Sequence, residues 1–245
     1  MVGMPRSRKG AFMSAGLEGA RLEEGAAVPG TAGYAEAAEW LIPRYESVPF
    51  EDKYRAVRDL LPTEPGVVLD IGAGTGVDAA WFAAQGHRVV AVEPLAAFRA
   101  AGRTLHPAPN IEWIDDSLPD VRRIAQRRET FDLVLLSAVW QHLAPDERTA
   151  AMTAILPLLK PGAIVVISIR HGPPPQGRRS FEVPVEETIA LAGAGGAHLL
   201  LAAQLPSVQA HNREAGVIWS WLVFRKATAD TSGNLPLVRP GYSGG

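Results

Sequence analysis

Short apolar runs alternate with helical patterns through most of the chain. The runs that read as strands cover residues 67–69, 88–94, 111–116, 131–136 and 163–169, with helical patterns at 77–85, 95–105, 121–129 and 145–159. Strands buried on both faces of a parallel sheet read as continuous apolar runs. Repeated strand–helix alternation is typical of an open, doubly wound sheet. The pattern therefore predicts an α/β, Rossmann-like architecture.

The rhythm changes after residue 169. A helix is expected over residues 186–192 and strands over 198–202 and 217–225. A short link between these two strands predicts an antiparallel pair at one side of the sheet. Within the helical pattern at 145–159, Pro157 predicts a kink or break. We expect a seven-stranded, mostly parallel sheet with an antiparallel last strand, in a single domain.

The two ends of the chain differ from the region between them. A length of 245 residues suits one domain with additional tails. We expect a mobile leader over residues 1–30, the domain over 31–226 and a disordered, Pro/Gly-rich tail over 227–245. The leader lacks the apolar stretch of a secretory signal. We therefore expect a cytoplasmic protein.

Composition narrows the classes of partner. A formal net charge of −2 provides no basic field for nucleic acid. The chain has no cysteine, which excludes disulfides, thiolate metal sites and a cysteine nucleophile. Its apolar runs are too short to span a bilayer. We expect no nucleic-acid partner, no membrane and no metal, and the sequence leaves open whether the chain forms a homodimer.

The stretch VVLDIGAGTG, residues 67–76, places glycines directly after the first strand. Gly72, Gly74 and Gly76 remove side chains, so a ligand can lie against the backbone. The helix that begins near Val77 directs N–H groups and partial positive charge at the same place. Glu93 ends the second strand, where a carboxylate can accept hydrogen bonds from both hydroxyls of a ribose. The pattern predicts a nucleotide-like ligand at the carboxyl ends of the strands.

A nicotinamide or flavin dinucleotide is one candidate for this ligand. Its fingerprint is G-x-G-x-x-G, whereas this loop reads G-A-G-T-G, with the third glycine one position early. Asp70 also precedes the loop, and its charge would repel a pyrophosphate. The same charge would attract a ligand that carries an amino group and a sulfonium.

The run Asp70-Ile71-Gly72-Ala73-Gly74-Thr75-Gly76 resembles the E/D-x-G-x-G-x-G motif of the class I S-adenosylmethionine-dependent methyltransferases. The resemblance extends over roughly residues 34–225. Four further motifs follow in the family's order: Glu93-Pro94-Leu95, Asp115-Asp116-Ser117-Leu118, FDLVLLSAVWQHL at 131–143 and LLKPGAIVVIS at 158–168.

The resemblance implies S-adenosylmethionine as cofactor, with S-adenosylhomocysteine as product. It implies that Asp70 contacts the methionine amino group, directly or through water, and that Glu93 binds the ribose hydroxyls. Asp116 would accept a hydrogen bond from the adenine amine, with Asp115 as its competitor and a helix-start acid as the structural alternative. An N-terminal helix covers the cofactor in similar enzymes. The implied cofactor-binding residues are Asp70, Gly72, Ala73, Gly74, Gly76, Glu93, Pro94, Asp116, Ser117, Leu118, Ser137 and Tyr45.

His142 is the candidate catalytic residue. It lies just past the fourth strand, at the rim where substrate should enter, and an imidazole titrates near neutral pH. The alternative is a histidine that only packs or caps the next helix. Trp140 could wall the substrate pocket or contact the sulfonium through a cation–π interaction. Core packing is its alternative role.

The stretch RHGPPPQGRRSFEVP, residues 170–184, leaves the carboxyl end of the fifth strand. We predict that Arg170, His171 and Arg179 bind substrate, because arginine pairs bidentately with carboxylates and other anions. A solvated surface loop is the alternative. Arg178 adds to the positive charge of the same stretch.

The combined reading is a methyltransferase that acts on an N, O or S atom of a small molecule, anionic if the arginine stretch binds it. The fourth strand ends Ser137-Ala138-Val139-Trp140 and lacks the [ND]-P-P-[YFW] signature of enzymes that methylate nucleic-acid amino groups. Two alternatives remain open. The same cofactor could serve cyclisation or aminocarboxypropyl transfer, or the chain could bind the cofactor without catalysis.

Overall fold

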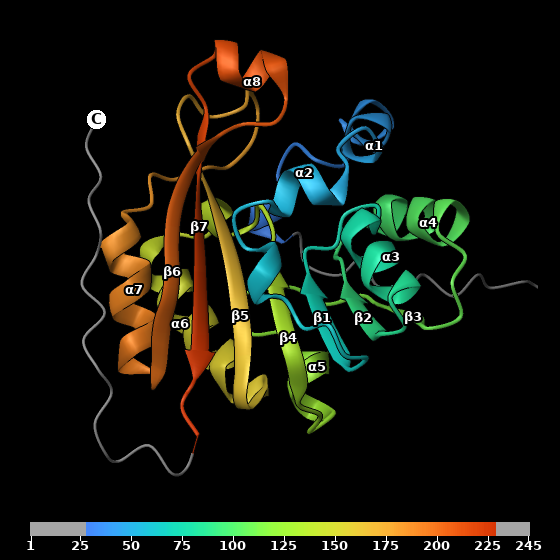
Figure 1. Ribbon diagram of the computed structural model, residues 1–245. Helices are drawn as coiled ribbons and strands as arrows, with labels where there is room; N and C mark the ends of the chain where they lie inside the picture. The colour runs from blue at the N-terminus through green and yellow to red at the C-terminus, as the bar shows by residue number, and fades with distance from the viewer. Residues whose placement is uncertain (1–27, 229–245) are drawn as a thin grey trace, which may run out of the picture.

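A computed structural model describes residues 28–228 of the chain, so most of the predicted leader and tail lies outside the described residues. Seven strands form one sheet in the order β3-β2-β1-β4-β5-β7-β6 (Figure 1). The strands are β1 (Val67–Ile71), β2 (Arg88–Val92), β3 (Ile111–Ile114), β4 (Phe131–Leu136), β5 (Leu159–His171), β6 (Ala197–Pro206) and β7 (Ile218–Lys226).

The strand pairing confirms the predicted sheet. β1 to β5 are parallel to one another, and β7 lies between β5 and β6, antiparallel to both. β6 and β7 are linked by residues 207–217, a connection short enough to make them an antiparallel hairpin. The strand order reverses beside β1, and ligands of doubly wound sheets bind at such a point.

Helices lie on both faces of the sheet, as Figure 1 shows. The α-helices are α1 (Ala38–Glu46), α2 (Phe50–Tyr54), α3 (Val77–Ala84), α4 (Ala96–Leu105), α5 (Arg122–Gln126), α6 (Pro145–Ile155), α7 (Val185–Ala194) and α8 (Ala210–Glu214). Short 3₁₀ helices are η1 (Pro29–Thr31), η2 (Arg58–Leu60), η3 (Trp140–His142) and η4 (Leu156–Leu158). The helix α6 ends just before Pro157, as the sequence predicts.

Successive side chains of the central strands enter two separate apolar layers. On β4, Leu133 and Leu135 pack with α2 and α3, whereas Val134 and Leu136 pack with α5, α6 and α7. This alternation is the period of two that a strand imposes on its side chains. The sheet is therefore buried on both faces at its centre, which is why its strands read as unbroken apolar runs.

The run Lys160-Pro161-Gly162 lies inside β5, which is longer than the strand predicted over residues 163–169. Leu159 pairs with Phe131, but the next partner pair is Ile164 with Leu133, so residues 160–163 bulge from the ladder. Gly162 has φ +79°, a conformation that favours glycine.

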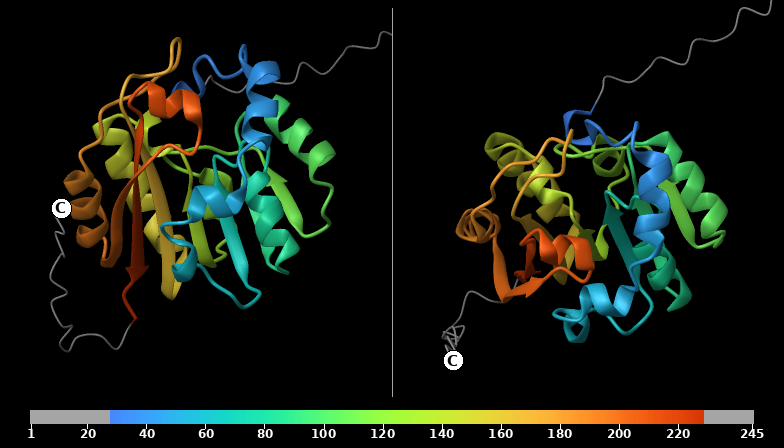
Figure 2. Two further views of the ribbon diagram at one scale, coloured as in Figure 1. Left: turned by 45° about the horizontal axis from the view of Figure 1, so that its top comes forward. Right: turned by 90° about the horizontal axis from the view of Figure 1, so that it is seen from above.

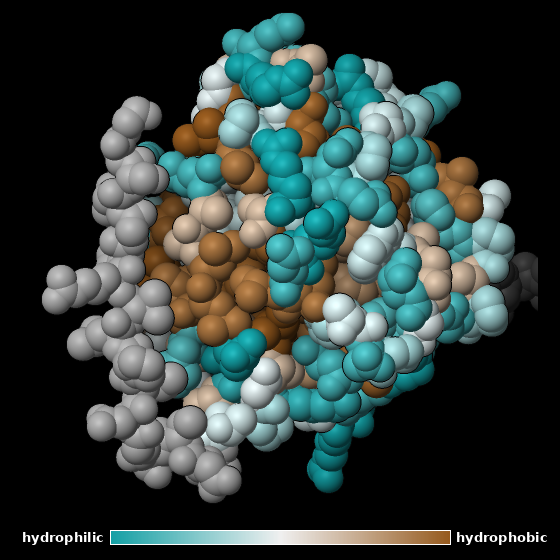
Figure 3. All heavy atoms as spheres, in the orientation of Figure 1, coloured by the Kyte–Doolittle hydropathy of each residue, from teal (hydrophilic) through white to brown (hydrophobic). Residues whose placement is uncertain are grey.

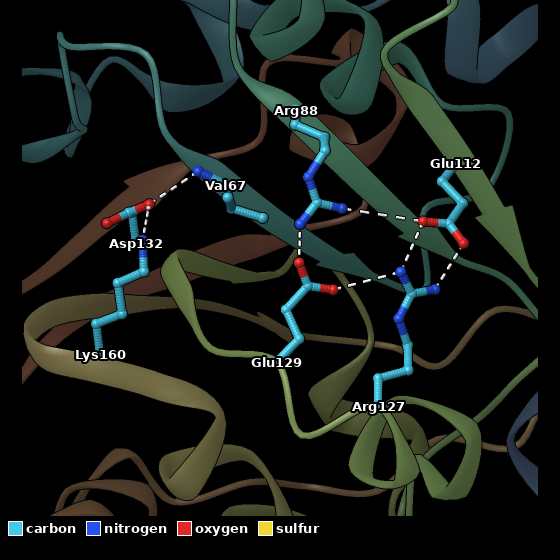
Figure 4. A network of polar contacts seen from close by, with 7 residues as sticks. All are labelled: Val67, Arg88, Glu112, Arg127, Glu129, Asp132 and Lys160. Atoms are coloured by element: carbon cyan, nitrogen blue, oxygen red, sulfur yellow. Dashed lines mark hydrogen bonds and ion pairs between the residues drawn. The ribbon is translucent and has the colours of Figure 1, made fainter.

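Polar side chains join the strands at the edge of the sheet where the parallel strands begin (Figure 4). Arg127 holds Glu112 with two hydrogen bonds of 2.6 and 2.8 Å, and Arg88 pairs with Glu129. A further carboxylate, Asp132, accepts the Val67 N–H at 2.8 Å. The opposite edge, where the strands end, is left for the glycine loop.

The face of the sheet over β5, β7 and β6 is covered less completely. Figure 3 shows apolar side chains gathered there, where Figure 1 shows no covering helix. Leu199 and Leu200 of the edge strand β6 are both exposed. Within residues 28–228, no helix is long and apolar enough to cross a membrane.

Trp113 is pinned between the glycine loop and α4, and Gly102 makes room for it. A Cβ added at Gly102 would lie 2.3 Å from the Trp113 ring and 2.8 Å from the Thr75 carbonyl oxygen. We expect Gly102→Ala to lower the free energy of unfolding by about 1–3 kcal/mol through overpacking, in spite of alanine's better helix propensity. Denaturant unfolding measures the change.

Gly193, near the end of α7, is the matched control. A Cβ added there meets nothing within 4 Å. Gly193→Ala should therefore be neutral or stabilise the protein by up to about 1 kcal/mol. If Gly102→Ala stabilised the protein as Gly193→Ala does, the close packing of Trp113 against Gly102 would be contradicted.

Candidate functional site

A cavity of about 830 Å³ lies over the carboxyl ends of the central strands. Seen from above in Figure 2, the N-terminal helices, the loop after β5 and α8 surround the ends of these strands. Small-molecule sites usually have volumes of about 300–1,000 Å³, so this cavity has room for more than one small ligand.

The glycine loop forms the floor of the cavity. Gly72 has φ +74°, and a Cβ added there would lie 2.4 Å from Val139. Gly76 has φ +85° and is the N-cap of α3. The backbone can therefore turn sharply at the end of β1 and bring its N–H groups to the cavity surface without side chains in between.

Glu93 is held by the loops on either side of it. Its carboxylate accepts the Gly74 N–H at 2.9 Å and the Leu95 N–H at 2.8 Å. The residue is only 5% exposed and lines the cavity. Burial raises the pKa of Glu93 to about 7, against the lowering effect of the two amide hydrogen bonds. Each carboxylate oxygen has a further lone pair that a ribose hydroxyl could use.

Two buried acids lie close together beneath the glycine loop. Asp78 lines the cavity and accepts hydrogen bonds from Lys53 at 2.6 Å and from the Tyr54 hydroxyl at 2.7 Å. Asp70 lies behind the cavity wall, and its Oδ2 has no hydrogen-bond partner. Burial, and next the charge of Asp78, raise the pKa of Asp70 well above its ordinary value.

This acidic pair fits the amino group of S-adenosylmethionine. Lys53 pairs with Asp78 and makes no ion pair with Asp70, so an ammonium group in the cavity would offset the repulsion between the two acids. No sequence signal marks Asp78 as a site residue, because an acid in the first turn of a helix ordinarily indicates a helix start. The position of Asp70 behind the wall favours contact through water over the direct contact.

The residues expected around adenine lie at the end of β3. Asp116, Ser117 and Leu118 line the cavity. The Asp116 carboxylate also accepts the N–H groups of Ser117 and Ile124, at 2.9 and 3.0 Å, so it acts in addition as the helix-start acid of α5. Its competitor Asp115 pairs with Arg99 and does not line the cavity.

A strained turn follows β4 and positions the candidate base. Ala138 has φ +60°, which costs a non-glycine residue about 1 kcal/mol or more. Hydrogen bonds hold this turn in place. The Ala138 N–H donates to Ser168 Oγ at 2.8 Å, and Gln141 Nε2 donates to the Ala138 oxygen at 2.7 Å. Ser137, just before the turn, lines the cavity as expected.

His142 faces the cavity as a neutral imidazole with one defined tautomer. Its Nδ1 lies 2.6 Å from the carbonyl oxygen of Arg179, which can only accept, so Nδ1 carries the proton. Its Nε2 therefore offers a lone pair and accepts the Tyr34 hydroxyl at 2.8 Å. Burial lowers the pKa of His142, and the charges of Arg178, Arg170 and Arg179 lower it further.

Tyr34 is a cavity residue that the sequence pattern does not single out. It lines the cavity between His142 and Tyr45, and its hydroxyl forms hydrogen bonds with both side chains. Tyr45 lies over the glycine loop, where a Cβ at Gly74 would be 3.5 Å from its ring. Burial raises the pKa of both tyrosines, so both stay protonated and able to donate. The aromatic residues before β1 carry no pattern that separates Tyr34 from its neighbours.

The end of β5 and the loop after it bring two arginines to the cavity, only one of which was expected there. Arg170 lines the cavity as predicted, and Arg178 lines it too. His171 instead contacts Ser220 Oγ at 2.8 Å, and Arg179 pairs with Glu147 at 2.8 Å. Neither of these residues lines the cavity, so the structure does not place them beside the other predicted substrate-binding residue, Arg170. Adjacent arginines on a loop look alike in sequence, and only the path of the loop distinguishes them.

Trp140 also lies away from the cavity. Its side chain is fully buried in the apolar layer of α6 and α7, and its indole N–H donates to Thr188 Oγ1 at 2.9 Å. It does not line the cavity, so core packing is its role. Trp219 and Trp221 of β7 line the cavity instead.

The other predicted residues are placed as follows. Those that line the cavity are Gly72, Ala73, Gly74, Glu93, Pro94, Asp116, Ser117, Leu118, Ser137, Tyr45, His142 and Arg170. Gly76 does not, and it acts by starting α3. Residues 28, 30 and 31, at the border of the predicted leader, also line the cavity. Within residues 28–228, no group of three metal-ligating side chains is found.

The raised pKa of Glu93 predicts a pH-dependent affinity for S-adenosylhomocysteine. Ribose hydroxyls donate to the ionised carboxylate, so below about pH 7 binding must first remove a proton. The affinity should rise by up to about tenfold per pH unit toward pH 7 and level off above it. Calorimetric titration across this range measures the slope.

Glu93→Gln is the matched variant for this titration. This variant should bind S-adenosylhomocysteine more weakly, and its affinity should not change with pH, because an amide does not ionise in this range. A slope that persists in Glu93→Gln and disappears in Asp70→Asn would show that Asp70, and not Glu93, is the titrating group.

Residues 68–162 match the sequence model of a family described as a methyltransferase domain. A search of curated protein sequences found no match. Among solved structures, the chain is similar to the 1,6-didemethyltoxoflavin-N1-methyltransferase of Burkholderia thailandensis, with bound 1,6-didemethyltoxoflavin and S-adenosylhomocysteine. The identity is 23%, the TM-score 0.56, and the match covers 82% of this chain and 91% of that one.

Two more structures show the same fold at lower identity. The N-methyltransferase NodS of Bradyrhizobium japonicum, in complex with S-adenosylhomocysteine, is 16% identical with a TM-score of 0.58, over 78% of this chain and 97% of that one. An S-adenosylmethionine-dependent methyltransferase of Mesorhizobium loti is 16% identical with a TM-score of 0.60. The match covers 74% of this chain and 99% of that one.

The matched residues include the glycine loop, Glu93 and residues 116–118, which together form what we call the cofactor half of the cavity. The glycine loop, Glu93 and the acidic pair fit S-adenosylmethionine as the cofactor. Residues 68–162 are therefore similar to a methyltransferase domain, and the chain shares the fold of solved S-adenosylmethionine-dependent methyltransferases.

Proposed function

We propose that the protein transfers the methyl group of S-adenosylmethionine to an N, O or S atom of a small molecule, with His142 as the general base. The observation that carries this proposal is the free-base Nε2 of His142, which faces the same cavity as the glycine loop. When bound, S-adenosylmethionine supplies an electrophilic methyl group on a sulfonium. The residues of the chain have to align an acceptor with it, exclude water and remove a proton.

The roof over the cavity is made by two segments that are far apart in sequence. Residues 28–34 and the loop after β5 meet where a Cβ at Gly33 would lie 2.2 Å from the Gly177 carbonyl oxygen. Gly33 also has φ +76°, so both the close approach and the backbone conformation at this position require glycine. Such a roof supports the proposal, because it shields the reacting atoms from bulk water.

The acceptor loses its proton along a chain of two side chains. The Tyr34 hydroxyl already donates to Nε2 of His142. As the acceptor atom attacks the methyl group, its proton passes to the Tyr34 oxygen and the Tyr34 proton passes to Nε2. The Arg179 carbonyl stabilises the resulting imidazolium through the Nδ1–H. His142 returns the proton to solvent after the product leaves.

The first experiment titrates the protein with S-adenosylmethionine and S-adenosylhomocysteine, and then screens small amines, phenols and thiols. Methyl transfer is detected as formation of S-adenosylhomocysteine together with an acceptor that is heavier by one methylene. Cofactor binding with a product of another mass would favour cyclisation or aminocarboxypropyl transfer. Absence of cofactor binding would contradict the proposal.

With an accepted substrate, His142→Gln should lower kcat by about 10²–10⁴-fold, the usual contribution of a general base. Tyr34→Phe should lower kcat as well, because it interrupts the proton path without removing the ring. His198→Gln, at an exposed position on β6, is the control and should leave kcat unchanged.

The pH profile provides a second readout of the same assignment. Because burial lowers the pKa of His142 below its ordinary value of about 6.5, kcat/KM should be constant above about pH 7 and fall in more acid solution. A Tyr34→Phe variant with wild-type kcat would remove Tyr34 from the proton path. A His142→Gln variant with wild-type kcat would remove His142 as the base.

A further inference from the structure

Two guanidinium groups face the cavity without a carboxylate partner. Arg170 donates from Nη1 to the Pro173 oxygen at 2.6 Å, and Arg178 stacks over the Tyr34 ring, 4.6 Å from its centroid. Within residues 28–228, no acid lies within ion-pair distance of either group, whereas the neighbouring Arg179 is neutralised by Glu147. A guanidinium carries five N–H donors, so both keep donors available for a ligand.

The acids that line the cavity lie on other elements. Asp78 is paired with Lys53, Glu93 is held by two backbone amides, and Asp116 by two others. Asp52, the remaining acid of the lining, lies on α2. The side of the cavity toward His142 is therefore positive, and the lowering effect of Arg178 and Arg170 on the pKa of His142 agrees with this.

An apolar wall stands beside the two arginines. In the sheet, Arg170 of β5 is paired with Trp219 of β7, and Trp219 is paired with Leu205 of β6. Directly paired residues of antiparallel strands point to the same face, and all three of these residues line the cavity. A positive group, an aromatic ring and an aliphatic side chain therefore follow one another across three strands.

Building on the proposed methyl transfer, we propose that the acceptor is a small anion with an apolar ring. Its carboxylate or phosphate binds between Arg170 and Arg178, and its ring lies against Trp219. The geometry places this anion site one residue away from the base, because Arg178 stacks on Tyr34 and Tyr34 is hydrogen-bonded to His142. Arginine forms bidentate hydrogen bonds with planar anions, so these two residues would select anionic over neutral acceptors.

Four probes test this site by calorimetric titration, with and without saturating S-adenosylhomocysteine. They are benzoate, phenyl phosphate, inorganic phosphate and the neutral benzamide. We expect benzoate and phenyl phosphate to bind at least about tenfold more tightly than benzamide, a difference of about 1.4 kcal/mol. Phenyl phosphate should also bind more tightly than inorganic phosphate, and Trp219→Ala should remove that advantage. The relative affinities of benzoate and phenyl phosphate show whether the site prefers a carboxylate or a phosphate.

Arg178→Gln and Arg170→Gln should each reduce anion binding at least about tenfold and leave benzamide binding unchanged. Arg178→Lys should restore part of it, because it keeps the charge but not the fork of donors. Arg122→Gln, at an exposed residue that pairs with Asp120, is the control and should bind as the unmodified protein does. Thermal unfolding of each variant confirms that it folds.

The proposal is overturned if no probe anion binds, if benzamide binds as tightly as benzoate, or if Arg178→Gln keeps full affinity for the anions. These outcomes leave the proposed methyl transfer standing as long as S-adenosylhomocysteine binds. Failure of the unmodified protein to bind S-adenosylhomocysteine would instead contradict the proposed function itself.

Discussion

The hydrogen bond from the Gly74 N–H to the Glu93 carboxylate joins the loops that follow β1 and β2, and the cofactor half of the cavity is organised around it. Gly74 makes this bond with φ +58°, and Glu93 is almost completely buried. A buried carboxylate is costly unless it is hydrogen-bonded, and the two amides that donate to Glu93 provide that compensation. They also hold its oxygens at the cavity surface, where ribose hydroxyls can reach them.

The site stores unfavourable electrostatics that a ligand would relieve. Asp70 has an unpartnered oxygen and lies beside Asp78, while Arg170 and Arg178 have no carboxylate within ion-pair distance in the part of the chain that the structure describes. A zwitterionic cofactor and an anionic acceptor would balance these two regions separately. Such an arrangement is typical of functional sites, where local stability is given up for binding.

The substrate half of the cavity is assembled from parts that lie far apart in the chain. The N-terminal segment supplies Tyr34, the turn after β4 supplies His142, and the loop after β5 supplies Arg178 and the Arg179 carbonyl. The His142 imidazole is where they meet, because its two nitrogens bind Tyr34 on one side and the loop on the other. A change at any one of these segments would therefore alter the hydrogen bonds of the His142 imidazole.

The sequence by itself determined the seven-stranded sheet with its antiparallel last strand. It also determined that the glycine loop and Glu93 lie at the edge of the sheet where a ligand binds. These depend on local rules: apolar runs make buried strands, glycines permit positive φ, and an acid at a strand end faces the ligand edge. Only the tertiary structure decided that Trp140 is buried in the core, that Arg178 and not Arg179 faces the cavity, and that Tyr34 and Asp78 belong to the site. Such assignments depend on which way a loop turns and on which distant segment packs against it. Neither the periodicity nor the residue type of a single stretch carries that information.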